Sequence, residues 1–216
     1  MKTGILITLP ASDDVTEYLS AFSKDIILSS RENQIAIKPL ERKEVTRDNV
    51  ERMIKKLDYN MIVFNGHGSP KSILGHKNEK IISADENHYL LKDRIIYARS
   101  CWSVMELGEK CVRGNKNGCF IGYRIPFMFI IDTTRATNPL KDNTARIFFE
   151  TSNLIPLGLI KGHTAGDSNE SSKKKMLKEI TKALGRKDKD SHAIAQTLWN
   201  NYIGQEVIGN LDETLG

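Results

Sequence analysis

Hydrophobic positions in the first half of the chain alternate between short apolar runs and stretches with helical spacing. The apolar runs predict buried strands at 4–9, 34–40 and 61–65. Between them, apolar residues recur every three or four positions. This spacing predicts one helix that Asp13 or Asp14 caps and that continues through Ile26, and another that begins after Thr46. Repeated strand–helix units predict a mostly parallel sheet with helices on both faces, an α/β fold.

The pattern changes along the rest of the chain. Residues 72–83 predict a hairpin that turns at Lys77-Asn78, 93–101 predicts a fourth strand followed by a helix, and 118–131 predicts one or two more strands. From about 138 onward helical spacing dominates. The polar segment 164–172 predicts a loop, and 206–210 predicts an edge strand.

No internal repeat or low-complexity tract divides the chain. We therefore expect a single domain over 1–216, with a sheet-rich half at 1–137 and a helical half at 138–216. At 216 residues and 39% hydrophobic content, such a domain can bury a substantial core.

Composition and charge exclude several classes of function. No run approaches the roughly 18–20 apolar residues that span a membrane. The net charge of +5 includes the basic segments 173–175 and 185–189, but no aromatic residues are interleaved with them, so we do not expect a nucleic-acid partner. Neither a GxSxG nor a phosphate-binding glycine motif occurs.

The three cysteines indicate a reducing, cytoplasmic setting, because their number is odd and none is spaced as CxxC. Histidines and cysteines also lack the spacing of a structural zinc site, so we expect neither metal nor cofactor. Cys111 and Cys119 fall on apolar faces, which predicts that both belong to the core.

One histidine and one cysteine follow consecutive predicted strands. His67 lies in the Gly-His-Gly turn after 61–65, and Cys101 ends the strand 93–101. Because the carboxyl ends of parallel strands meet at one edge of a sheet, we expect the two side chains to lie together. We also expect Cys101 near a helix N-terminus, whose partial positive charge favours the thiolate.

An imidazole beside a thiol is suited to acyl transfer. The thiol is mostly protonated at neutral pH, and the imidazole can take up its proton or donate one to a leaving amine. The backbone N–H groups of Gly68 and Cys101 are candidate donors to an oxyanion.

The segments "VFNGHG" and "IIYARSCWS" together resemble the caspase-like superfamily of cysteine peptidases, which includes gingipains and CHAT-type proteases. The segments 118–127 and 200–215 are more weakly similar to it. The resemblance implies a caspase-like three-layer sandwich, with His67 as general acid/base and Cys101 as nucleophile. Gly68 and Cys101 would form the oxyanion hole.

The resemblance further implies an endopeptidase that cleaves selected protein substrates without a cofactor, for example in a bacterial defence or cell-death pathway. It leaves room for an activating protein partner. The main alternative is a catalytically inactive caspase-like scaffold that binds partners, and alkylation of the cysteine would separate the two.

Three charged residues are candidates for selecting the substrate. Arg99 lies two residues before Cys101, at the position that often lines the primary specificity pocket in the family, and its guanidinium suits a substrate carboxylate. Asp13 and Asp14 follow the first strand, where relatives also place pocket residues. Their carboxylates could neutralise Arg99, select a basic side chain, or only cap a helix.

Overall fold

The computed structural model of the chain describes residues 1–186 and 189–216. Of the basic segment 185–189, Lys187 and Asp188 lie outside the described residues. Among the described residues, no helix combines the length and the apolar character needed to cross a membrane.

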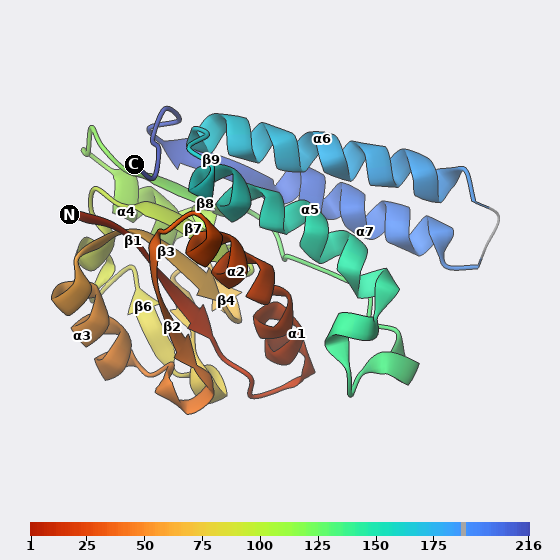
Figure 1. Cartoon of the computed structure of the whole chain (residues 1–216), viewed down its shortest axis with the longest axis horizontal. Helices are drawn as coiled ribbons and strands as arrows, with labels where there is room; N and C mark the ends of the chain where they lie inside the picture. Colours follow the sequence, from red (N-terminus) through yellow and green to blue (C-terminus); the bar gives the residue numbers. More distant parts are fainter. Residues whose placement is uncertain (187–188) are drawn as a thin grey trace.

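A six-stranded sheet forms the centre of the molecule (Figure 1). Its order is β2-β1-β3-β7-β8-β9. The strands are β1 (Lys2–Leu9), β2 (Ala36–Glu41), β3 (Tyr59–Asn65), β7 (Ile95–Arg99), β8 (Cys119–Tyr123) and β9 (Gln205–Gly209). The first five are mutually parallel, and β9 pairs antiparallel with β8. The predicted parallel sheet and its C-terminal edge strand are thus confirmed.

Helices cover both faces of this sheet, as the sequence predicts. The helices are α1 (Asp14–Phe22), α2 (Lys24–Glu32), α3 (Arg47–Leu57), α4 (Glu109–Val112), α5 (Asn143–Ile160), α6 (Ala165–Leu184) and α7 (Ser191–Gly204). Apolar residues of α3 and α4 pack on one face, and those of α2, α5 and the start of α6 pack on the other. Burial on both faces explains why β1, β3 and β7 are almost continuously apolar.

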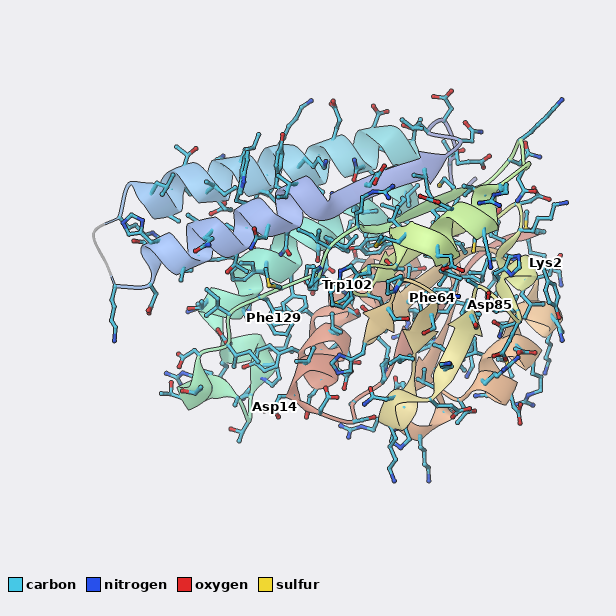
Figure 2. All side chains as sticks on the ribbon, turned by 180° about the vertical axis from the view of Figure 1, so that it is seen from behind. Lys2, Asp14, Phe64, Asp85, Trp102 and Phe129 are labelled. Atoms are coloured by element: carbon cyan, nitrogen blue, oxygen red, sulfur yellow. The ribbon has the colours of Figure 1, made fainter. Side chains whose placement is uncertain are left out.

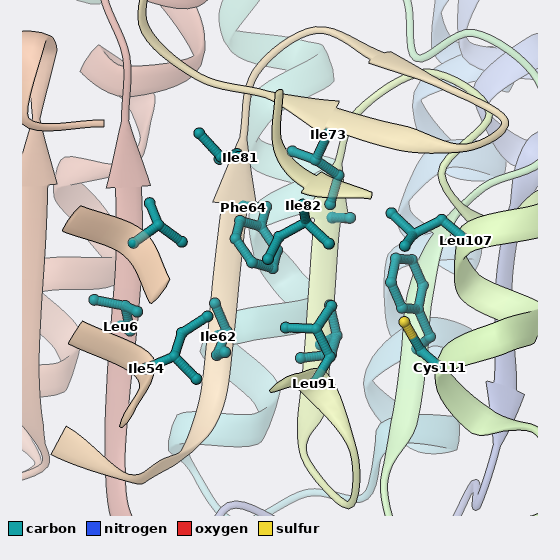
Figure 3. Packing of buried hydrophobic residues seen from close by; sticks show 14 of the residues in the cluster. Leu6, Ile54, Ile62, Phe64, Ile73, Ile81, Ile82, Leu91, Leu107 and Cys111 are labelled. Carbon is teal, nitrogen blue, oxygen red and sulfur yellow. The ribbon is translucent and has the colours of Figure 1, made fainter. Parts of the chain in front are cut away.

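A second, three-stranded sheet follows His67. It contains β4 (Gly68–Ser69), β5 (Ser72–Leu74) and β6 (Lys80–Ser83), and β5 and β6 form the predicted antiparallel hairpin. Ile73 and Ile82 point from it into the core beside Phe64 of β3 (Figure 3). The small sheet therefore anchors the loop after β3 to the same core as the central sheet.

Two predicted elements differ in the structure. The first helix ends at Phe22, and Ser23 separates it from α2. A single strand, β8, forms within 118–131, where one or two were predicted, and the chain after Tyr123 continues without regular structure. The predicted loop 164–172 is wrong: Thr164 caps α6, which begins at Ala165.

Candidate active site

The carboxyl ends of β3 and β7 bring His67 and Cys101 to the same edge of the sheet. Asn65 and Arg99, the last residues of the two strands, lie opposite each other in the parallel register. Each candidate residue follows two positions later. The Ser100 hydroxyl donates a hydrogen bond of 2.8 Å to the carbonyl of Gly66, which ties the two loops together beyond the strand ends.

Gly68 lies directly against the backbone of Cys101. A Cβ atom at position 68 would be 2.6 Å from the Cys101 carbonyl oxygen and 3.2 Å from its nitrogen, closer than a side chain allows. Only glycine permits this contact, which gives a physical reason for the His-Gly pair. No hydrogen bond joins the Cys101 backbone N–H to another residue in the described part of the chain.

Asp13 orients the imidazole of His67. Its Oδ2 lies 2.9 Å from His67 Nε2, while its Oδ1 accepts a hydrogen bond of 2.8 Å from the Thr16 backbone and caps α1. Partial burial would raise the pKa of the Asp13 carboxyl, but the hydrogen bonds from Thr16 and His67 outweigh it and lower that pKa. When Nε2–H donates to Asp13, Nδ1 is the nitrogen left to accept a proton.

Cys101 occupies a half-buried position that differs from the predicted helix N-terminus. The chain continues from it through a turn into a π-helical segment at Val104–Gly108, and only then into the short α4. Its Sγ lies 3.9 Å from the carbonyl oxygen of Phe127. Burial raises the pKa of the thiol above its usual range, although local backbone hydrogen bonds oppose the shift. The predicted stabilisation of the thiolate by a helix is therefore wrong.

This raised pKa predicts a distinctive pH dependence for alkylation. Because the thiol is protonated below its pKa, its reaction with iodoacetamide should be slow at neutral pH and should accelerate only above the range of a free cysteine, about 8.5. Peptide mapping by mass spectrometry can follow Cys101 against Cys111 and Cys119. Burial raises the pKa of each of those two to about 12, so they should stay unmodified in the folded chain. A midpoint below pH 7 would instead indicate a resting thiolate–imidazolium pair.

Arg99 does not reach the surface, contrary to its predicted place in a specificity pocket. Its exposed fraction is 0%, and its guanidinium lies 5.3 Å from the ring centroid of Phe149. All five N–H groups donate hydrogen bonds of 2.7–3.0 Å, to the side-chain oxygens of Ser23, Asn65, Ser152 and Asn153. A substrate carboxylate would find neither access nor a free donor, so this arrangement does not fit recognition of an acidic side chain.

The Arg99 cluster fixes the ends of three neighbouring strands. Asn65, which accepts two of the arginine's hydrogen bonds, also donates its side-chain N–H to the carbonyl of Thr8 at 2.8 Å. The Thr8 hydroxyl in turn donates to the Asn65 carbonyl and accepts from its backbone N–H. β1, β3 and β7 are thereby joined just below His67 and Cys101. Sequence reasoning missed this cluster, because its members lie far apart along the chain.

Asp14 is exposed in the first turn of α1. No three histidine, cysteine or acidic side chains lie close enough together to hold a metal ion within residues 1–186 and 189–216. Cys111 and Cys119 are buried, as their apolar settings predict.

Comparisons with known proteins find similarity in structure and none in sequence. No family model matches the chain, and no curated protein matches it. The crystal structure of gingipain R, an Arg-specific cysteine proteinase, superposes with a TM-score of 0.64 at 11% identity, over 97% of this chain and 46% of that one. The complex of the pro- and mature domains of Porphyromonas gingivalis RgpB gives 0.61 at 10% identity, over 97% and 47%.

The chain therefore spans about half the length of these solved structures. At such low identity the comparison concerns architecture alone. The chain has the caspase-like α/β fold of the gingipain cysteine proteinase.

Proposed function

We propose that this chain is a cysteine endopeptidase that cleaves selected protein substrates with His67 and Cys101. The observation that carries the proposal is the close contact of Gly68 with the Cys101 backbone, which sets the histidine loop against the cysteine at the carboxyl edge of a gingipain-like sheet. The Cys101 thiol is half-buried and the His67 side chain is 35% exposed, so both groups are partly open to solvent.

In the proposed reaction, His67 Nδ1 takes the proton of the Cys101 thiol as sulfur attacks the scissile carbonyl. The raised pKa of the thiol makes this base necessary at neutral pH. The resulting imidazolium, held by Asp13, donates its proton to the leaving amine. Water then hydrolyses the acyl-enzyme, with His67 as base, and regenerates the thiol.

The oxyanion formed in each half-reaction needs two donors. We assign this role to the backbone N–H groups of Gly68 and Cys101, because the backbones of these two residues are in direct contact. Of the three charged residues predicted to select the substrate, Arg99 and Asp13 already form side-chain hydrogen bonds with other residues of the chain. Asp14 stays our candidate for attracting a basic side chain.

A catalytically inactive scaffold is the second candidate, because the resting thiol is protonated and half-buried. The same observation is compatible with an enzyme that an activating protein partner switches on. Comparison of the histidine variants below separates an enzyme from a scaffold.

Replacing His67 by alanine should lower kcat/KM for peptide cleavage by about 10²–10⁴-fold, since general acid–base assistance is lost. The exposed His163, which lies just after α5, provides the matched control, and His163→Ala should cleave at the parental rate. A proteome-derived peptide library analysed by mass spectrometry gives both rates. Equal cleavage by His67→Ala and the parent would refute the proposed mechanism. If neither the parent nor the variant cleaves any peptide, the result favours the scaffold.

A further inference from the structure

Trp102, the residue directly after the proposed nucleophile, has an unusual backbone conformation. Its φ is +56°, in the left-handed region that a bulky side chain rarely occupies. Two backbone hydrogen bonds hold it there: its N–H donates to the Ile125 carbonyl at 3.4 Å, and its carbonyl accepts from Met105 N–H at 3.1 Å. Such strain persists only where the surrounding structure imposes it, and it concentrates at functional sites.

The side chain of Trp102 is exposed between two buried neighbours. Ser100 and Ser103 are at most 1% exposed, whereas Trp102 is 38% exposed. Within the described residues its indole N–H donates no hydrogen bond to another protein group. A large apolar ring with a free donor is therefore presented to solvent one residue from Cys101.

An aromatic segment follows β8 and packs close to Cys101. Phe127, whose carbonyl oxygen contacts the Cys101 sulfur, belongs to a cluster that partly buried Phe129 and Ile131 extend. Figure 2 labels Trp102 and Phe129. The carbonyl of Ile125, at the start of this segment, also accepts the hydrogen bond from the Trp102 backbone N–H. This bond ties Trp102 to the aromatic segment at the edge of the sheet where Cys101 lies.

We infer that Trp102 is a specificity-determining residue, and that its indole packs against an apolar side chain of the substrate next to the scissile bond. This inference rests on the proposed peptidase function and names the substrate class of that site: peptides with an aliphatic or aromatic residue at a position flanking the cleaved bond. Apolar contact with a rigid ring strengthens binding without ordering a flexible side chain.

A glycine substitution at position 102 distinguishes the effect of the backbone conformation from the effect of the side chain. Trp102→Gly removes the indole and at the same time relieves the left-handed strain, so the thermal midpoint should not fall. We expect kcat/KM for a peptide with leucine at the selected position to drop at least about tenfold. The value for the matched alanine peptide should change less than about twofold, and Trp102→Phe should keep most of the preference.

Two controls define the outcome. Trp199→Ala removes another exposed tryptophan, on α7, and should leave the cleavage profile unchanged. The rate of Cys101 alkylation should be the same in Trp102→Gly and the parent, which shows that the dyad is intact. A parent that cleaves with the same library profile as Trp102→Gly overturns this inference alone. A parent that cleaves no peptide refutes the proposed function and this inference with it.

Discussion

Replacing Cys101 by alanine is expected to abolish peptide cleavage while leaving the free energy of unfolding almost unchanged. No other thiol can substitute, because Cys111 and Cys119 are buried and burial raises the pKa of each to about 12. The fold should tolerate the change, since the half-buried Cys101 sulfur makes only a long contact of 3.9 Å with Phe127. Cleavage of a peptide library and urea denaturation measure the two quantities.

Cys111→Ala provides the opposite control. Cys111 lies in the same core cluster as Leu107 (Figure 3), so its loss should cost about 1 kcal/mol of stability and leave the rate of cleavage intact. Parental activity in Cys101→Ala would show that Cys101 is not the nucleophile.

Replacing Arg99 by methionine is expected to destabilise the fold by about 3 kcal/mol or more. The methionine fills a similar volume, but it leaves the side-chain oxygens of Ser23, Asn65, Ser152 and Asn153 without their donor in a fully buried site. Each buried acceptor that loses its partner costs about 1–3 kcal/mol, which local rearrangement only partly recovers.

Urea unfolding of this variant can be compared with that of Arg113→Met, which changes an exposed arginine and should stay within about 0.5 kcal/mol of the parent. A similar small effect for Arg99→Met would mean that the buried cluster rearranges freely. The folded fraction of Arg99→Met should keep the parental cleavage profile. A changed profile would return Arg99 to the substrate pocket.

The two strands that precede the candidate site, and their parallel arrangement, could be predicted from the sequence. Apolar runs before His67 and Cys101 are long enough to identify β3 and β7, and the helical stretch between β1 and β3 implies a parallel arrangement. Residues that directly follow two neighbouring parallel strands then lie at the same edge of the sheet, largely independent of the loop conformation. The close approach of Gly68 to Cys101 agrees with that reasoning.

The environment of Arg99 could not be predicted in the same way. Strand periodicity assigns a side chain to one face of the sheet but does not say what covers that face. Ser152 and Asn153 come from α5, more than fifty residues further along the chain, and Ser23 comes from the break between α1 and α2. Buried serines and asparagines carry no pattern that distinguishes them from those of surface loops.

The same ambiguity explains the wrong loop at 164–172. Its glycine, serines and asparagine are typical of turns, yet in the structure small residues let α5 and α6 approach closely. A Cβ atom on Gly158 would lie 2.5 Å from the Ser168 hydroxyl, and buried Ser172 donates a hydrogen bond to the Thr151 carbonyl. Close helix packing and turn formation use the same residue types, so composition alone favoured the wrong one.

The half-buried, protonated thiol of Cys101 also affects how fast oxidants react with the protein. Peroxide reacts with thiolates far faster than with thiols, and the first product, a sulfenic acid, would end nucleophilic activity until it was reduced. Because burial keeps the proton on Cys101 at rest, the chain should tolerate oxidative conditions that inactivate peptidases with a preformed thiolate. On the proposed mechanism, its vulnerable state is the brief one in which His67 has accepted the proton.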